Sequence, residues 1–355
     1  MSDKLKVAVI GCGRMGALTT ERTRNSVPPV WMPLSHTDAV QAIEGASLVA
    51  VCDVSAEQAE KVAAAYPGVV AYTDHLKMLE QVKPDLVGIA TRTAGRCEII
   101  RDCVENGVRG IHTEKPMARS VDEARVALDA IDKQEAGLTF GAVRRYMAPY
   151  LLAREAVASG EIGEIHQVVI EHGSDMLLWG HPHTVDLAMF FNPGSVVNGV
   201  RAKLRIDPAD VDGHVVDCDP VLDMACLNFD NGVTAVITAG NGFNVRVHGS
   251  DGSIAVIGDG SRVELRKKVS GRPYELEHED LLFSDKVSGT QQAFLNLVDF
   301  VQNGTHTGIG SGEMESIHRV LFAMVMSELN QGREVAPSEV PSDFFVSGRF
   351  GDLYA

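Results

Sequence analysis

The stretch Lys6-Val7-Ala8-Val9-Ile10-Gly11-Cys12-Gly13-Arg14-Met15-Gly16 decides the fold of this chain. A short apolar, β-branched run predicts a strand, and the glycines after it have the spacing G-x-G-x-x-G. The first glycine permits a tight turn, the second lets the backbone approach a pyrophosphate, and the third allows close packing of helix on strand. We predict a helix from this turn to about Asn25, whose N-terminus would offer amide donors to phosphates. The residues expected to bind a dinucleotide are Gly11, Cys12, Gly13, Arg14, Met15 and Gly16.

Strand-like and helix-like segments alternate from this turn to residue 141. The expected strands cover residues 47–53, 69–72, 85–91, 110–113 and 138–141, and the expected helices cover 56–65, 74–81, 98–106 and 121–133. This alternation predicts an α/β domain with a doubly wound parallel sheet. Ligands bind such sheets at the carboxyl ends of the strands. Candidate residues that fall at expected strand ends, and so should share one edge, are Gly11, Asp53, Thr91 and Lys115.

The pattern changes after residue 141, where we expect a second, α+β domain with a large, mostly antiparallel open sheet. A helix is expected over 147–159 and strand-like runs at 165–172, 197–205, 221–229, 233–240, 244–248 and 253–257. Turns such as Asp230-Asn231-Gly232 join runs as hairpins do. Helices are expected at 290–302 and 312–330. The expected domains are 1–141 and 142–335, followed by a tail, 336–355, that should pack on the body of the protein or on a partner through Phe344, Phe345, Phe350 and Tyr354.

The composition excludes some classes of partner. The chain has 355 residues and a formal net charge of -16, which argues against nucleic acid or an anionic membrane as the main partner. Residues 1–4 are polar and no apolar run approaches the length of a membrane span, so we expect no signal peptide and a cytoplasmic location. The six cysteines are scattered without a C-x-x-C pair, which predicts reduced thiols and no metal site.

An insertion at residues 27–45 separates the first helix from the second strand. Three prolines in six residues exclude a helix at its start, and Thr37-Asp38 resembles the cap of a short helix that runs to Ile43. Trp31 either reaches a ligand or pins the loop to the domain. The insertion also explains why Asp53 lies further from the glycines than the usual ~20 residues.

Asp53 ends the second strand, where an acidic residue accepts both hydroxyls of the adenine ribose and disfavours a 2′-phosphate. We therefore favour NAD over NADP, although Ser55 leaves NADP open. The alternative is that Asp53 caps the helix over 56–65.

The segment Glu114-Lys115-Pro116 follows a strand and should face the ligand crevice. A lysine near a nicotinamide can hydrogen-bond a substrate hydroxyl, and a desolvated lysine can exchange protons. The alternative for Lys115 is an ordinary surface lysine.

The order of these short motifs resembles the Gfo/Idh/MocA oxidoreductases, the family of glucose–fructose oxidoreductase and inositol dehydrogenase. The resemblance rests on Gly11–Gly16, Glu114-Lys115-Pro116, Val143-Arg144-Arg145-Tyr146, Gly160-Glu161-Ile162-Gly163 and Gly249-Ser250-Asp251-Gly252-Ser253-Ile254, and it covers nearly the whole chain. It implies an NAD(P)-binding Rossmann domain, an open antiparallel sheet that often mediates dimers or tetramers, and hydride transfer at a hydroxyl or carbonyl carbon of sugars and cyclitols.

The resemblance also implies roles for individual residues. Lys115 matches the catalytic lysine, and His183-Thr184-Val185-Asp186 matches the H-x-x-D segment in which the histidine transfers the proton. Imidazole suits that task because its ordinary pKa is close to neutrality. Asp186 would bind substrate or orient its neighbours. Alternatively, His183 is only a residue at a helix N-terminus and Asp186 only a cap or surface charge. Further residues expected at the cofactor or substrate are Thr91, Glu114 and Arg145.

The sequence departs from the family pattern in three places. Trp179 stands where many members carry aspartate, four residues before the histidine, and His181 and Asp175 are candidate substitutes. Trp179 itself could stack on the apolar face of a sugar ring or belong to the core. Val143 stands where an asparagine is common. In the loop 91–96, Arg92 and Arg96 replace a more usual proline, asparagine and histidine, which suggests a substrate carboxylate or phosphate unless both arginines are simply solvated.

The leading interpretation is an NAD(P)-dependent dehydrogenase or reductase that acts on a sugar, sugar acid or cyclitol. A rival within enzymes is a redox-neutral reaction in which tightly held NAD oxidises the substrate transiently before elimination or hydrolysis. A rival from another class is a nucleotide-sensing regulatory protein without catalysis. The expected assembly is a homodimer or homotetramer through the open sheet.

Overall fold

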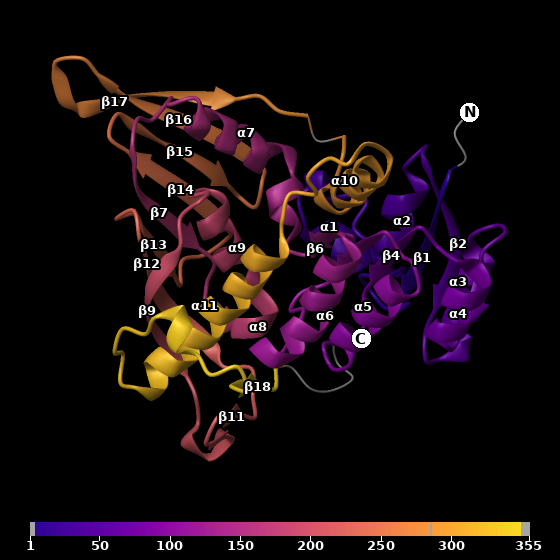
Figure 1. The fold of residues 1–355 in the computed structure, drawn as a ribbon. Coiled ribbons are helices and arrows are strands. Elements are labelled where there is room, and N and C mark those ends of the chain that lie inside the picture. Colours follow the sequence, from indigo (N-terminus) through magenta and orange to yellow (C-terminus); the bar gives the residue numbers. More distant parts are fainter. Residues whose placement is uncertain (1–3, 285, 349–355) are drawn as a thin grey trace. The chain divides into compact units, whose positions relative to one another are not determined.

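The computed structural model describes residues 4–284 and 286–348, and the chain divides into two compact units (Figure 1). Of the described residues, the first unit contains 4–146 and 287–315, and the second contains 147–284, 286 and 316–348. Residues 287–315 fall inside the sequence range expected for the second domain but group with the first unit. The reason is that helix α10 (Gly289–Asn303) packs against β5, β6 and α2.

The described strands of the first unit form a six-stranded sheet in the order β3-β2-β1-β4-β5-β6, with every pair parallel. Their bounds are β1 Leu5–Ile10, β2 Ala46–Cys52, β3 Val70–Tyr72, β4 Leu86–Ile89, β5 Gly110–Thr113 and β6 Gly137–Phe140. Strands β1, β4, β5 and β6 are buried almost throughout, as parallel strands covered on both faces must be. The α/β Rossmann-like expectation is confirmed.

Helices with clear start signals connect these strands. Their bounds are α3 Ala56–Ala65, α4 His75–Val82, α5 Arg96–Glu105 and α6 Val121–Gln134. Ser55, Asp74 and Ser120 are N-caps whose side chains accept backbone N–H groups of the first turn, which satisfies donors that a helix leaves unpaired. Ser55 rather than Asp53 therefore caps α3.

The first helix differs from the expectation that it runs from the glycine turn to about Asn25. Only one helical turn forms there, with Ala17 N–H and Leu18 N–H donating to the Gly13 carbonyl, and α1 begins later, at Glu21–Ser26. The chain then continues through η1 (Pro29–Trp31) to α2 (His36–Gln41), whose N-cap is Ser35 and not Thr37-Asp38.

Helix α2 takes over the hydrogen bonds that the interrupted first helix would have made. His36 N–H donates to the Met15 carbonyl at 2.8 Å and Thr37 N–H to the Gly16 carbonyl at 3.0 Å. The inserted segment is therefore residues 18–35, which include α1 and η1, and not the expected 27–45; it separates the first turn of a helix from its continuation in α2. Buried side chains on α2 join the core between the sheet and α10, which includes Val7, Val9, Ala39, Val40, Ile43, Leu86, Phe294 and Leu297.

The second unit contains a nine-stranded sheet built from its described strands. The order is β17-β16-β15-β14-β7-β13-β12-β8, β9 also pairs with β12, and all pairs are antiparallel except β7 with β13. The bounds are β7 Ile165–Glu171, β8 Asp175–Met176, β9 Val197–Arg205, β12 Val221–Phe229, β13 Thr234–Thr238, β14 Asn244–Gly249, β15 Gly252–Ile257, β16 Arg262–Val269 and β17 Arg272–Leu281. This confirms the mostly antiparallel sheet and adds β8, β16 and β17.

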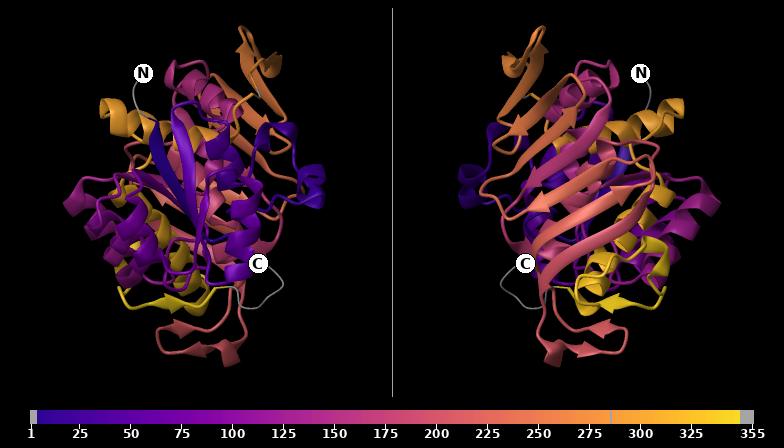
Figure 2. Two further views of the ribbon diagram at one scale, coloured as in Figure 1. Left: turned by 90° about the vertical axis from the view of Figure 1, so that its right-hand side faces the viewer. Right: turned by 90° about the vertical axis from the view of Figure 1, so that its left-hand side faces the viewer.

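Helices cover one face of that sheet, and the right-hand view of Figure 2 looks onto its other face. Helix α7 (Ala148–Ala158) packs on β15 and β16, and α9 (Pro182–Phe190) packs on β7. The remaining elements are η2 Val143–Tyr146 in the first unit, α8 Leu177–Gly180, η3 Pro208–Asp210, β10 Val211–Asp212, β11 Val215–Val216, η4 Pro337–Glu339 and β18 Phe345–Val346 in the second, and α11 Ser311–Leu329, which continues from one unit into the other.

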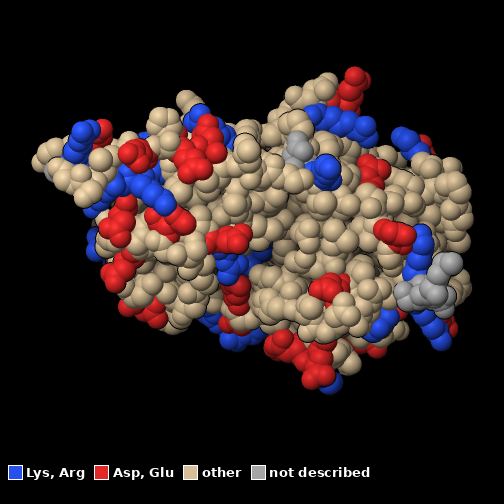
Figure 3. Space-filling model, turned by 90° about the horizontal axis from the view of Figure 1, so that it is seen from above, with Lys and Arg blue, Asp and Glu red and all other residues tan. Residues whose placement is uncertain are grey.

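In the tail, Phe344 is buried, and β18 pairs in parallel with β11. Phe350 and Tyr354 lie outside the described residues. None of the described helices is long and apolar enough to cross a membrane. On the face shown in Figure 3, acidic and basic side chains are interspersed. Arg272 and Glu275 on β17 form an exposed ion pair at 2.8 Å.

Candidate functional site

The candidate cofactor residues of the first unit lie at the ends of neighbouring strands. Gly11 follows β1, Thr91 comes two residues after β4, and Glu114 follows β5. Backbone hydrogen bonds extend the sheet to this edge, with Ala90 N–H donating to the Ile10 carbonyl and Glu114 N–H to the Ile89 carbonyl. The sheet therefore brings the glycine turn, the loop 91–96 and the Lys115 turn to one edge.

The glycine turn leaves no room for side chains at two of its positions. Gly11 has φ +95°, and a Cβ there would meet the Ala90 carbonyl carbon at 2.6 Å. A Cβ on Gly16 would lie 1.7 Å from the Gly11 carbonyl oxygen. The first and last glycines are thus required by backbone packing alone, which fits the tight turn expected around a pyrophosphate.

Asp53 fastens the glycine turn to the end of β2. Its Oδ2 accepts the Cys12 N–H at 2.7 Å, and its Oδ1 accepts the Ser55 N–H at 2.9 Å. Cys12 is buried beside it, and burial, together with the negative charge of Asp53, raises the pKa of the Cys12 thiol to about 12. The thiol therefore stays protonated at neutral pH. All six cysteines carry free thiols.

Arg96 holds the backbone around Lys115. This arginine is buried, and its guanidinium donates to the carbonyls of Glu114, at 2.8 Å, and of Pro116, with a further bond to the Thr91 carbonyl. The suggestion that Arg96 recognises a substrate anion is wrong, because its donors face these backbone carbonyls. Arg92 is exposed and Lys115 half-buried, and a substrate contact by Arg92 stays a prediction.

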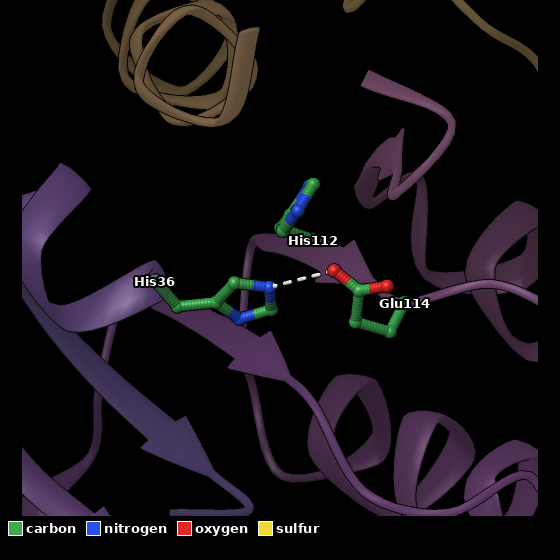
Figure 4. Close-up of side chains that lie close together, drawn as sticks. All are labelled: His36, His112 and Glu114. Atoms are coloured by element: carbon green, nitrogen blue, oxygen red, sulfur yellow. Dashed lines mark hydrogen bonds and ion pairs between the residues drawn. The ribbon is translucent and has the colours of Figure 1, made fainter. Parts of the chain in front are cut away.

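Glu114 lies in a buried cluster with His36 and His112, shown in Figure 4. His36 Nε2 is 3.4 Å from Glu114 Oε1, and His112 Nδ1 is 3.0 Å from Thr139 Oγ1. Burial alone would raise the pKa of Glu114, but the hydrogen bond from His36 and the nearby charges hold it well below its usual range. Burial also lowers the pKa of His112 to about 3. The cluster therefore holds a carboxylate beside a neutral His112.

These three residues also have the composition of a metal site. Their donor atoms lie within 4.8 Å of one another. Ligands of tetrahedral zinc, at ~2.0–2.1 Å from the ion, are only about 3.3 Å apart. His36 and Glu114 already bond to each other, so we interpret the cluster as a hydrogen-bonded histidine–carboxylate pair.

Two arginines of η2, Arg144 and Arg145, have structural partners. Arg145 is buried, donates to the Gly308 carbonyl and forms an ion pair with Glu313 at 2.7 Å. A substrate contact by Arg145 stays a prediction. The Arg144 guanidinium lies 4.7 Å from the centre of the Trp31 ring, which is itself buried. This favours the interpretation that Trp31 pins the inserted loop to its domain.

In the second unit, α8 and α9 carry the residues expected to contact substrate. Asp219 accepts the N–H groups of Leu178, at 2.7 Å, and Trp179, at 3.1 Å, so it fixes the start of α8. Trp179 and His183 are half-buried, whereas Asp186 is fully buried on α9. The alternative that Asp186 is only a surface charge is therefore wrong. The catalytic role of His183 stays a prediction.

The candidate substitutes for the missing aspartate lie together. His172 Nε2 is 3.6 Å from Asp175 Oδ2, and the rings of His172 and His181 are 5.3 Å apart. A Cβ on Gly180 would meet Asp175 Oδ2 at 2.4 Å, so the glycine makes room for this cluster. Burial raises the pKa of Asp175, but His172 and the Met176 N–H outweigh it and lower the pKa overall. Burial lowers the pKa of His181 to about 3.

The neutral state of His181 predicts a loss of stability in acid. Its folded pKa of about 3 lies below the ordinary value of 6.5. The unfolded chain therefore binds the proton first, so the contribution of His181 is complete above pH 6.5 and declines as pH falls toward 3. Between pH 6.5 and 5 the decline is about 2 kcal/mol. The free energy of unfolding in urea, measured at pH 7 and pH 5, should fall less for His181→Asn than for wild type.

The control for this measurement is His278→Asn, because His278 is exposed on β17. This variant should lose as much stability as wild type between the two pH values. Equal losses in wild type and His181→Asn would contradict the assignment.

Sequence reasoning missed several contacts around the candidate residues, namely those of His36, Arg96, His112, His172 and Asp219. His36 could have been found from the apolar spacing of His36, Ala39, Val40 and Ile43, which places the histidine on the buried face of α2. No comparable local signal identifies Asp219, because its partners on α8 are about forty residues away.

Comparison with known proteins places the chain among oxidoreductases. Residues 5–142 match the family GFO_IDH_MocA, described as an oxidoreductase family with an NAD-binding Rossmann fold. Inositol 2-dehydrogenase of Rhizobium meliloti is 27% identical over 71% of this chain and 75% of its own length. The scyllo-inositol 2-dehydrogenase (NAD(+)) of Bacillus subtilis is 26% identical over 72% of this chain and 75% of its own.

A crystal structure of an Agrobacterium radiobacter oxidoreductase in complex with NAD+, L-tartaric acid and magnesium has the same fold. Its TM-score is 0.73 at 19% identity, and the match covers 94% of this chain and 99% of that one.

Proposed function

Because this chain is a member of the Gfo/Idh/MocA oxidoreductases, we propose that it transfers a hydride between NAD and a hydroxyl or keto carbon of a cyclitol, sugar or sugar acid. The chain is an NAD(P)-dependent enzyme of the sugar and polyol dehydrogenase type. Two relatives that carry the name inositol 2-dehydrogenase support a cyclitol as the first substrate class to test.

The observation that carries this proposal is the single edge formed by the ends of β1, β4 and β5. Gly11, Thr91 and Lys115 follow these neighbouring strands. A Cβ on Gly11 would clash with the Ala90–Thr91 peptide, so this position needs a glycine, as the tight turn before a pyrophosphate site does. The residues present therefore fit a dinucleotide. Bound NAD would accept or donate the hydride.

The chain's own residues supply the proton chemistry. Lys115 would hydrogen-bond the reacting hydroxyl, which lowers the free-energy cost of its deprotonation. His183 would accept the proton, since imidazole changes charge close to neutral pH. Asp186, buried on the same helix, would orient its neighbours.

The proposal is tested by turnover. The purified protein should reduce NAD+ with at least one member of a panel of inositols, aldoses and sugar acids, followed by absorbance of the reduced nicotinamide. NADP+ in parallel tests the preference for NAD. Bound NAD without reduction across the panel in either direction would reject the dehydrogenase.

Trp179 favours a second candidate, the redox-neutral reaction. An indole donates but cannot accept a proton, so the aspartate of the usual set has no equivalent at this position. This candidate predicts that NAD co-purifies with the protein and that sugar is converted without net reduced nicotinamide. Mass spectrometry of the products, with and without added NAD+, distinguishes the two candidates.

Replacing Asp53 by alanine should weaken NAD binding about tenfold, or about 1.4 kcal/mol. The variant removes the proposed acceptor for the ribose hydroxyls and leaves the Cys12 N–H without its carboxylate. Calorimetric titration gives the dissociation constant. Ser55→Ala is the matched control: it removes the cap of α3 and should lower stability by about 1 kcal/mol but leave the affinity for NAD nearly unchanged. Unaltered affinity in Asp53→Ala would remove the ribose assignment.

A further inference from the structure

His36 contacts both turns that the proposed chemistry depends on. Its backbone N–H donates to the Met15 carbonyl of the glycine turn at 2.8 Å, and its Nε2 lies 3.4 Å from Glu114 Oε1. Glu114 directly precedes Lys115. His36, a buried residue at the start of α2, is therefore hydrogen-bonded both to the glycine turn and to Glu114, the residue before the proposed catalytic lysine.

The Glu114 carboxylate links His36 to the backbone of Lys115. Lys115 N–H is 3.3 Å from Glu114 Oε2, while Oε1 of the same carboxylate accepts from His36. Arg96 holds the carbonyls on either side of Lys115, those of Glu114 and Pro116. The turn is thus held through its backbone by one buried arginine and through the Glu114 side chain by one buried histidine.

Packing leaves this arrangement little freedom. A Cβ on Gly88 would meet His36 Nδ1 at 2.8 Å and Phe294 Cζ at 2.9 Å, and a Cβ on Gly141 would meet Glu114 Oε2 at 2.8 Å. Both side chains therefore rest directly against backbone. The ring of Phe294 on α10 lies 5.6 Å from the ring of His36.

The charged and titratable groups that face Glu114 come from four places. His36 comes from α2, His112 from β5, Arg96 from α5, and Lys115 is the next residue. A carboxylate in a dry interior is stable only when it is hydrogen-bonded and paired. Removing the imidazole would leave Glu114 with a weaker set of partners, and it would move or take up a proton.

We propose that His36 is a positioning residue, which holds Glu114 so that Lys115 is presented correctly and which ties that turn to the cofactor turn. This inference rests on the proposed function of Lys115. His36→Leu keeps the backbone N–H, so the bond to Met15 survives and only the bond to Glu114 is lost. The expected effect is therefore on kcat and not on NAD affinity.

The experiment compares three variants of the full-length enzyme. His36→Leu should lower kcat at least tenfold while the dissociation constant of NAD changes less than threefold. His36→Gln, which can still donate to Glu114 Oε1, should recover most of kcat. His75→Leu is the matched control, because it removes another histidine that pairs with a carboxylate of the same unit, Asp102 at 3.0 Å, and it should keep wild-type kcat.

A double-mutant cycle separates positioning from general damage. If His36 acts through Glu114, His36→Leu and Glu114→Gln together should lower kcat little more than the worse of the two alone. Multiplicative losses would overturn the proposal, as would kcat within twofold of wild type in His36→Leu. One bound divalent metal per wild-type chain, lost in His36→Leu, would also overturn it in favour of a metal centre.

A measurement that needs no substrate tests the positioning role of His36 independently of the proposed function. Reductive methylation of Lys115, followed by peptide mass spectrometry, reports how the turn presents the half-buried amine. The rate should rise at least threefold in His36→Leu and stay at the wild-type value in His36→Gln and His75→Leu. If the protein shows no turnover but the labelling rates differ in this way, the dehydrogenase is rejected and the positioning role of His36 is retained. Turnover with equal labelling rates in all variants rejects the positioning role.

Discussion

Lys115→Ala should lower kcat by about 10²–10⁴-fold, the range expected when a positioned group for proton transfer is removed. The affinity for NAD should change little, because the glycine turn and Asp53 are untouched. Steady-state kinetics with the best substrate from the panel, together with titration of NAD, measure the two quantities separately.

Two further variants sharpen the test on Lys115. Lys115→Arg keeps the positive charge but cannot lose its proton at neutral pH, so it should be nearly as impaired as alanine if the lysine exchanges a proton. Lys77→Ala removes an exposed lysine of α4 in the same unit and should keep wild-type kcat. His183→Ala should also lower kcat by orders of magnitude. Wild-type rates in Lys115→Ala or His183→Ala would remove that residue from the mechanism.

The parallel sheet could be predicted because each of its strands is a local signal. Apolar runs such as those of β1 and β4 are bounded by turn residues, and the helices α3, α4 and α6 begin with Ser or Asp caps. Once the strand order is that of a doubly wound sheet, the ends of neighbouring strands must share an edge. The position of Gly11, Thr91 and Lys115 on one edge followed from that rule.

The interrupted first helix could not be predicted in the same way. Its two parts are joined by bonds from His36 to Met15 and from Thr37 to Gly16, across about twenty residues of insertion. Local helix propensity cannot predict that the chain comes back to continue the hydrogen bonds of the first turn. The prolines after Val27 indicated only that the helix ends.

The hairpin of β16 and β17 was missed for a different reason. Charged residues such as Arg266 and Glu264 interrupt the apolar alternation of a half-buried strand. Their cross-strand and same-face pairs, including Arg266 with Glu264 at 2.6 Å, become visible only in three dimensions. The helix expected over 290–302 likewise carries no local sign of its domain, and only its packing on β5 and β6 assigns residues 287–315 to the first unit.

The roles of buried polar residues depend on such contacts most strongly. Arg96 in the sequence resembles a second anion-binding arginine beside Arg92. Its burial and its bonds to three backbone carbonyls give it a structural role. The two arginines differ in solvent exposure, because Arg92 is exposed and Arg96 is buried. The residues next to them in the sequence do not predict this difference.

Gly16→Ala should abolish NAD binding and lower the melting temperature strongly. The new Cβ would lie 1.7 Å from the Gly11 carbonyl oxygen and 2.9 Å from its carbon. Both are backbone atoms, so no side chain can move aside and the turn itself must open. Overpacking costs typically 1–3 kcal/mol, and an overlap with backbone this close should exceed that range. Opening the turn would also displace the Met15 carbonyl from His36, which holds the start of α2.

Gly45→Ala is the matched control for this variant. Its Cβ would meet only Val298 Cγ1 at 3.6 Å, an ordinary contact, so NAD affinity and melting temperature should stay close to wild type. Calorimetric titration and thermal unfolding measure both variants. If Gly16→Ala bound NAD as tightly as Gly45→Ala, the turn at Gly11–Gly16 would not be the cofactor site. Loss of NAD binding in Gly16→Ala but not in Gly45→Ala would support the turn at Gly11–Gly16 as the cofactor site, because only Gly16→Ala forces the Gly11 backbone to move.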